Sequence, residues 1–355
     1  MSPTEIFWIL SDAVKPPSIL DRFARDGRAE KSGAPNLMAR EGCAEDLDAC
    51  RALYRSLGVP CSDACWRILP DMWRALLANG IMQLFLVEDR AKPPGSRIVS
   101  FSATLFVADG FCGEAQSTLP PYLGAQVARH YLARALPVLN RKQAAQANAR
   151  DGLNVMLCFG GLEHDGFSHE QVLAVREKQN EAFHLALNGY RMKEFLADPI
   201  GEETFAWMRD GGVRLRRDYS NYFRKRRAPV PKSSQRPWLV GLTKEEAFAH
   251  PGSHFGGLFV YTSPRFHFNR SEQRLLRHAL MGETCEEEAA SLFISPWTVK
   301  KRWHAIYERV ADVDRELLPL PIADGPRATA RGAERRRHLL HYLRQHPEEL
   351  RPFVE

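Results

Sequence analysis

The chain has 355 residues, of which 44% are hydrophobic and 26% are charged, so it can hold two domains with a sizeable core and is too apolar to be disordered. Lysine and arginine outnumber the acidic residues by 49 to 43, a formal charge of +6 that agrees with a nucleic-acid partner without establishing one. No run of 18 apolar residues and no secretory leader pattern occurs, so we expect a cytoplasmic protein without membrane contact.

The seven cysteines are expected to be reduced and mostly buried as small hydrophobic side chains. Cys43, Cys50, Cys61 and Cys65 are close in sequence, but neither neighbouring pair has the two-residue gap of a zinc site and no histidine completes a ligand set. We therefore expect no metal and no cofactor.

Residues 1–212 predict an α/β domain, a mixed sheet with helices. Apolar positions at helical spacing recur between Thr4 and Asn79, and two strand-like runs from Met82 and Arg97, joined by a turn-rich segment, predict a hairpin. The remaining predicted elements are a helix at Gly124–Asn140, a strand from Asn154, a helix at His169–Asn188 and a strand that ends near Asp198.

This order of hairpin, helix, strand, helix and strand, between Leu69 and Asp198, resembles the GNAT acyltransferase domain. The resemblance implies that acyl-CoA binds through a glycine-containing turn ahead of a helix, where backbone N–H groups approach the diphosphate. The corresponding stretch is expected at PPYLGAQVARHYL, which contains Gly124 and Gln126 but no second glycine. We interpret these two residues as an ordinary helix start and assign no catalytic residue.

Two further stretches have alternative interpretations. Residues 160–166, GGLEHDG, could form an acid/base cluster at a strand end, but a polar turn explains them better. Residues 213–250 begin with a densely basic run and are predicted to form a linker. That linker could add phosphate contacts or could simply be a solvated hinge.

Residues 251–355 predict an all-α domain with helix-turn-helix geometry. Asn269 with Glu272, and Thr284 with Glu287, are spaced as capping boxes that start two helices. Ser295 is suited to cap a third helix. Only two residues separate the second helix from the third, and so short a turn makes the two helices cross steeply.

The third helix is predicted to be amphipathic, with a basic outer face. The residues predicted to pack inward are Val299, Trp303 and Ile306. Lys300, Lys301 and His304 then point away from the core, where they could reach base edges or phosphates.

The segment ISPWTVKKRWHAIY resembles the LuxR-type (GerE-like) helix-turn-helix. This resemblance implies double-stranded DNA as the partner, with base contacts from Lys300, Lys301 and His304 and phosphate contacts from Ser295 and Thr298. The alternative is an ordinary three-helix packing unit whose lysines are only solvated.

The segment departs from the LuxR-type pattern at Glu283 and Glu288, where the family has apolar residues. Because an unpaired buried carboxylate is costly, we expect either a rotated scaffold helix or a partner surface against these acids. A later amphipathic stretch, AERRRHLLHYLRQHPEEL, predicts a helix that is either a fourth helix of the domain or a dimer contact.

The sequence therefore predicts a homodimeric transcription regulator, not an enzyme, whose N-terminal sensory or dimerisation domain could bind an unidentified small molecule. Three alternatives stay open: an acyltransferase fused to a DNA-binding module, a helix-turn-helix used for protein contact, and an N-terminal domain that serves only for dimerisation.

Overall fold

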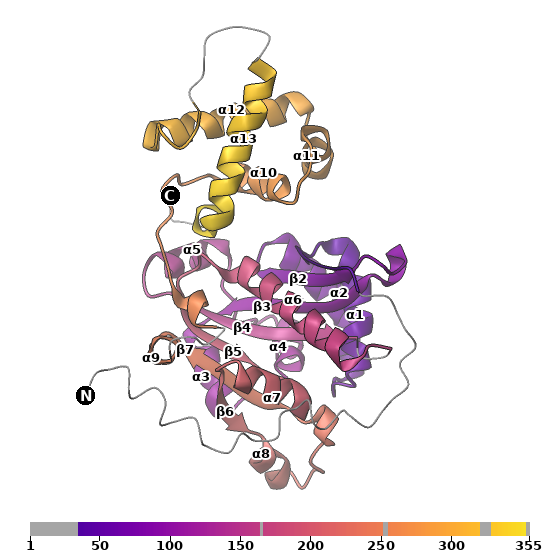
Figure 1. Ribbon diagram of the computed structural model, residues 1–355. Coiled ribbons are helices and arrows are strands. Elements are labelled where there is room, and N and C mark those ends of the chain that lie inside the picture. Colours follow the sequence, from indigo (N-terminus) through magenta and orange to yellow (C-terminus); the bar gives the residue numbers. More distant parts are fainter. Residues whose placement is uncertain (1–34, 164–165, 251–254, 320–327, 353–355) are drawn as a thin grey trace, which may run out of the picture.

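The computed structural model describes residues 35–163, 166–250, 255–319 and 328–352, so the helices predicted from Thr4 lie partly outside the described residues. Within these ranges seven strands form one mixed sheet in the order β1-β2-β3-β4-β5-β7-β6 (Figure 1). The strands are β1 (Leu37–Glu41), β2 (Met82–Asp89), β3 (Ile98–Val107), β4 (Leu153–Leu162), β5 (Met192–Ala197), β6 (Arg214–Asp218) and β7 (Trp238–Thr243).

Neighbouring strands are antiparallel everywhere except between β4 and β5, which run parallel. The predicted hairpin is present, since β2 and β3 pair from Met82–Leu105 onward. β4 then pairs with β3, and the long helix α6 (His169–Leu187) crosses over to bring β5 alongside β4. The predicted order of hairpin, helix, strand, helix and strand is thus observed, and the mixed sheet with its helices resembles the GNAT fold.

Helices cover both faces of the sheet, each over its own apolar core. On one face lie α1 (Leu47–Ser56), α2 (Asp63–Ala78), α3 (Asp109–Ser117), α4 (Leu123–Leu132) and α8 (Ser220–Lys225). On the other lie α5 (Arg141–Ala149), α6, α7 (Glu202–Asp210) and α9 (Lys244–Ala249). Edge-to-face aromatic pairs anchor both cores: Trp73 contacts Phe159 on the first face, and Phe183 contacts Phe195 on the second.

The predicted linker at 213–250 is wrong, because these residues complete the sheet. They form β6, α8, β7 and α9, and β7 lies between β5 and β6. The sequence of β7, WLVGLT, is a continuous apolar run with five of six residues buried, which is typical of an interior strand. The linker was predicted from the basic run that precedes β7, and the apolar run of β7 itself was not used. The sheet therefore extends from β1 to β7, beyond the predicted domain end at residue 212 and beyond the stretch Leu69–Asp198 that carries the resemblance.

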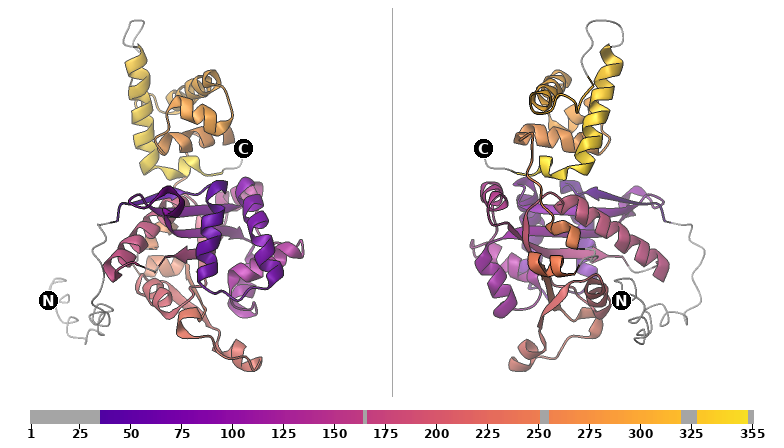
Figure 2. Two further views of the ribbon diagram at one scale, coloured as in Figure 1. Left: turned by 90° about the vertical axis from the view of Figure 1, so that its right-hand side faces the viewer. Right: turned by 60° about the vertical axis from the view of Figure 1, so that its left-hand side comes forward.

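Four helices after the sheet form what we call the C-terminal helical unit: α10 (Arg270–Leu280), α11 (Cys285–Leu292), α12 (Pro296–Val313) and α13 (Ala328–Gln345). The side chains of Asn269, Thr284 and Ser295 accept the expected capping hydrogen bonds. Val299, Trp303 and Ile306 are buried in one core together with apolar residues of α10, α11 and α13. In Figure 2, α13 stands beside the other three helices of this unit.

The buried Glu288 explains why α13 belongs to this unit. Its side chain is 0% exposed and forms an ion pair of 2.6 Å with Arg336 of α13, while Trp303 Nε1 donates to its other oxygen at 3.1 Å. Glu283 is bound to His278 at 2.9 Å. Neither a rotated helix nor a partner surface is needed, because partners for both acids come from within the unit.

The C-terminal helical unit also contacts the sheet domain. Arg351, which is buried, donates to the carbonyl oxygens of Leu185 and Asn188, both at 2.8 Å. Leu185 lies in the last turn of α6, and Asn188 directly follows this helix. Arg141 of α5 donates to Gln273 of α10 at 2.8 Å. These contacts connect the end of α6 and helix α5 to the C-terminal helical unit, which lies above them in Figure 1.

Replacing Arg336 by Met should leave Glu288 buried without its cation and should destabilise the C-terminal helical unit by about 3–5 kcal/mol. The double variant Arg336→Met/Glu288→Gln should recover most of this loss, because a neutral amide can still accept from Trp303. Chemical denaturation followed by circular dichroism measures both. A loss below about 1 kcal/mol for Arg336→Met would mean that the pair behaves like an exposed one.

Candidate functional site

A β-bulge in β4 lies at the edge of a cavity of the sheet domain. Phe159 pairs with Ala103 and Leu157 pairs with Thr104, so Cys158 between them has no partner on β3. Such a bulge bends and twists its strand. The parallel pairing with β5 ends at Leu157, although β4 continues to Leu162.

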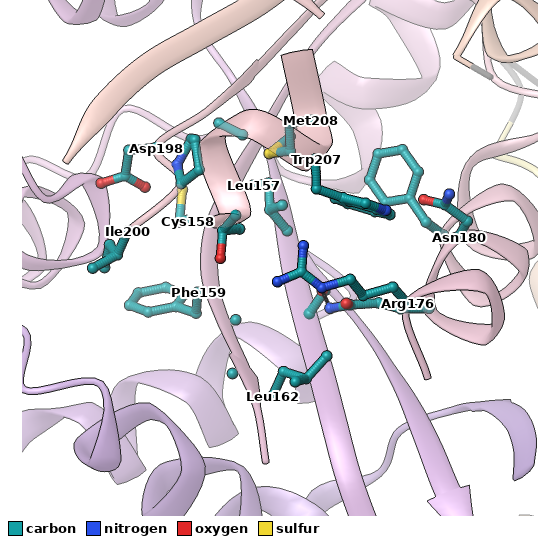
Figure 3. Close-up of a pocket in the computed structure, with 18 of the residues that line it drawn as sticks. Leu157, Cys158, Phe159, Leu162, Arg176, Asn180, Asp198, Ile200, Trp207 and Met208 are labelled. Carbon is teal, nitrogen blue, oxygen red and sulfur yellow. Dashed lines mark hydrogen bonds between the residues drawn. The ribbon is translucent and has the colours of Figure 1, made fainter. Parts of the chain in front are cut away.

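Beyond the end of this pairing lies a cavity of about 140 Å³, which we call the β4–β5 cavity (Figure 3). Its walls are mainly apolar and aromatic, and they include Leu157, Phe159, Phe183, Phe195, Trp207 and Met208. Gly160 adds no side chain, and a Cβ placed there would meet only the Phe101 carbonyl at 3.4 Å and the Ser102 hydroxyl at 3.7 Å. The cavity can therefore hold an apolar group beside an open strand edge.

Asp198 lies where β5 ends and contributes a carboxyl group to the cavity wall. One carboxyl oxygen accepts the backbone N–H of Leu123, the first residue of α4. A helix N-terminus favours a carboxylate, but burial among apolar and aromatic side chains has the larger effect and raises the pKa of Asp198 well above its ordinary value.

Further weak acids surround Asp198 and are held in their neutral forms. Burial raises the pKa of Tyr54, Tyr122 and Tyr219, with that of Tyr122 at about 12, and the nearby Asp198 adds to each shift. Burial likewise raises the pKa of Cys158 well above its usual range. The Cys158 thiol is therefore no thiolate nucleophile, and Asp198 is the group in this cluster best suited to exchange a proton.

Helix α6 supplies the polar side of the cavity. One stripe of this helix faces the cavity at the spacing i, i+3, i+4 and i+7, and it consists of Arg176, Gln179, Asn180 and Phe183. Gln179 donates to the Ser102 hydroxyl at 2.6 Å and ties α6 to β3. Arg176 contacts the cavity with a guanidinium group that is almost completely buried.

The five residues predicted to bind DNA lie elsewhere, together at the start of α12. Lys300, Lys301 and His304 are exposed, and the Lys301 ammonium lies 5.4 Å from the centre of the Trp297 ring. The Ser295 hydroxyl accepts the N–H of Thr298 and lies 2.9 Å from its hydroxyl, so both hydroxyls take part in the helix cap. The His304 imidazole lies 3.3 Å from Glu308, which places an acid beside the basic face.

The stretch PPYLGAQ is the start of α4, and it is packed rather than open. Leu123 N–H is occupied by Asp198, and a Cβ on Gly124 would lie 2.5 Å from the Tyr54 hydroxyl and 2.7 Å from the Cys158 carbonyl. Residues 160–162, predicted to be part of a polar turn, belong to β4, and the chain between β4 and α6 spans residues 163–168. Of the acids predicted there, Glu163 pairs with Lys92 at 2.8 Å, whereas His164 and Asp165 lie outside the described residues.

Several other chemistries find no support in the described part of the chain. No group of three or more His, Cys, Asp or Glu residues there is arranged to hold a metal ion. The seven cysteines, all within the described ranges, are free. None of the described helices has both the length and the apolar character needed to cross a membrane.

No protein-family model and no curated protein matches this chain. Among solved structures, it is similar to mutant forms of the spermidine/spermine N-acetyltransferase SpeG from Vibrio cholerae, with 9% identity over 60% of this chain and 96% of that chain and a TM-score of 0.34. It is similar to FeeM, an N-acyl amino acid synthase from uncultured soil microbes, with 10% identity, 62% and 98% coverage and a TM-score of 0.34. It is also similar to NAA60 of Arabidopsis thaliana in complex with acetyl-CoA, with 9% identity, 59% and 99% coverage and a TM-score of 0.35.

These matches correct the expectation that the chain is not an enzyme, because many of the structures it resembles are acetyltransferases of the GNAT type. At such identities the likeness concerns the fold and does not extend to substrates. The LuxR-type resemblance gains no support from the comparisons and stays a prediction. Asp198 and Arg176 were missed as site residues, since the only local signal was an Asp-Pro pair after an apolar strand.

The raised pKa of Asp198 predicts a pH-dependent loss of stability. A carboxyl group whose pKa is higher in the folded protein stabilises it fully below its unfolded value of 3.8, and this contribution is lost as the pH rises through the folded value. The Asp198→Asn variant can still accept from Leu123 but cannot ionise. Its melting temperature should therefore gain on that of the wild type as the pH is raised from about 5 to about 8. A constant difference between the melting temperatures of the variant and the wild type over this pH range would contradict a raised pKa of Asp198.

Proposed function

We propose that the sheet domain is an acyltransferase that binds an acyl-thioester in the β4–β5 cavity. The observation that carries this proposal is the end of the parallel pairing at Leu157, after which β4 continues from Cys158 to Leu162 along an apolar cavity. The arm of coenzyme A contains two amides, which can pair with an open strand edge. The apolar walls suit the acyl chain, and the resemblance of the sheet to the GNAT fold agrees with this assignment.

The first turn of α6 is the proposed position of the diphosphate. This helix follows β4 along the chain, and the N-terminal end of a helix dipole favours an anion. The preceding turn contains Gly166, whose positive φ of 81° places the backbone in a conformation that side chains disfavour. This turn, rather than PPYLGAQ, corresponds to the glycine-containing turn that the resemblance implies.

In the proposed reaction an amine attacks the thioester carbonyl, so that a C–N bond forms and the C–S bond breaks. The amine loses one proton and the leaving thiolate gains one, so the reaction needs no oxidant or reductant. Asp198 is the proposed proton carrier, because burial raises its pKa and so favours the protonated form. Tyr54, Tyr219 and Cys158 stay neutral and exclude water around it.

Filling the cavity tests this proposal. The Gly160→Leu variant should fold, since its Cβ meets no atom closer than 3.4 Å, while its side chain should occupy the space for the acyl chain. Octanoyl-CoA binding, measured by calorimetry, should weaken by at least about tenfold. Gly113→Leu, on the exposed side of α3, is the matched control and should bind as the wild type does. If the wild type does not bind octanoyl-CoA, the proposal is wrong.

We propose a second function, for the C-terminal helical unit: it binds double-stranded DNA through α12. Its specific support is the exposed basic face of Lys300 and Lys301, near the N-terminus of a helix that follows a three-residue turn. Because one such head buries little surface on a half-site, we propose a homodimer whose two heads lie about 34 Å apart on the DNA. The whole chain would then be a transcription regulator with an acyl-thioester-binding domain.

Replacing Lys301 by Ala should weaken binding to a DNA site selected from random sequence by about 1–3 kcal/mol and relax the preference at one base pair. Lys225→Ala removes the same charge from α8 of the sheet domain and should change affinity little. Fluorescence anisotropy at several salt concentrations measures both effects. Unchanged affinity and preference in both Lys300→Ala and Lys301→Ala would rule out α12 as the reading helix.

A further inference from the structure

Arg176 is a cation inside an apolar cavity. The residue is 5% exposed, and its neighbours on the cavity side of α6 and α7 include Phe183, Trp207 and Met208. Burial has lowered the pKa of this guanidinium, which reflects the cost of removing a charge from water. A charge at such a position is normally compensated by a partner.

Glu203 compensates the charge of the Arg176 guanidinium only in part. Arg176 Nη2 donates to Glu203 Oε1 at 3.1 Å, and the guanidinium carbon lies 5.4 Å from the centre of the Trp207 ring. The Glu203 side chain is 45% exposed, so water screens its charge. A guanidinium has five N–H donors, and within the described residues Glu203 is the hydrogen-bond acceptor that the structure gives it.

No other charge in the cavity balances Arg176. Among the described residues that line the β4–β5 cavity, Arg176 is the only lysine or arginine, and Asp198 is the only acid. Figure 3 shows Asp198 and Arg176 at separate places around the cavity, with the guanidinium directed inward. Because burial disfavours the ionised form of Asp198, Arg176 is the main charged centre beside the apolar walls.

We infer that the β4–β5 cavity recognises a small amphipathic monocarboxylate, whose carboxylate binds Arg176 and whose apolar body packs against Phe159, Phe183 and Trp207. A planar carboxylate can accept two N–H groups of one guanidinium at once, and its single negative charge balances the single cation. A phosphate monoester would bring about two charges into the same apolar space. The inference rests on the proposed function, in that it names the chemistry of a substrate for the same cavity.

Octanoate and octanol, which differ in the acid group, test this assignment by calorimetry on the full chain. The wild type should bind octanoate about tenfold more tightly than octanol. Arg176→Gln should abolish this preference, and it strands no buried acid because Glu203 is half exposed. Glu203→Gln frees the guanidinium from its internal partner and should strengthen octanoate binding. Gly160→Leu should weaken both ligands, since both occupy the cavity.

A merely structural Arg176–Glu203 ion pair would lower the melting temperature of both variants and leave the ratio of the octanoate and octanol affinities unchanged, and that result would overturn the inference. Tighter binding of octyl phosphate than of octanoate would overturn the choice of a carboxylate. Octanoyl-CoA separates this inference from the proposed function. Binding of octanoyl-CoA without a preference for octanoate refutes only the inference, whereas an Arg176-dependent preference without octanoyl-CoA binding refutes only the acyltransferase.

Discussion

The end of the parallel pairing between β4 and β5 is the constraint on which the candidate site depends. β5 ends at Ala197, opposite Leu157, whereas β4 continues to Leu162, so its residues from Cys158 onward are not paired with β5. The β-bulge at Cys158 lies at the same point of β4, in its pairing with β3. Directly after β5, Asp198 accepts the first N–H of α4. These elements line the cavity together.

Electrostatics divides this cavity into two parts. Around Asp198, burial raises the pKa of a carboxyl group, three tyrosines and a thiol and so favours their neutral forms. Around Arg176, a cation that cannot lose its proton is only partly balanced by Glu203. An uncharged proton carrier and a fixed positive centre in one apolar space are suited to a substrate that has both a reactive carbonyl or amine and an anionic group.

Helix α6 joins the two candidate sites physically. Its middle turns line the β4–β5 cavity, and its last turn supplies a carbonyl to the buried Arg351 that follows the C-terminal helical unit. The C-terminal helical unit is itself closed by α13, because Arg336 reaches the buried Glu288 and Trp303 donates to the same acid. A ligand that contacts α6 therefore binds one helix away from the contacts that position α10–α13 on the sheet domain.

The sequence by itself determined the local features. Caps at Asn269, Thr284 and Ser295, the hairpin of β2 and β3, and the inward face of α12 all depend on residues within a few positions of one another, so their patterns could be recognised. The DNA contacts assigned to α12 remain a prediction of the same local kind. The tertiary structure alone decided the rest. Asp198 and Leu123 are 75 residues apart, Arg336 and Glu288 are 48 apart, and β7 finds its place between β5 and β6 through pairing across the sheet. The pKa of Asp198 and the exposure of Arg176 depend on which distant side chains surround them, and spacing along the chain carries no record of that environment.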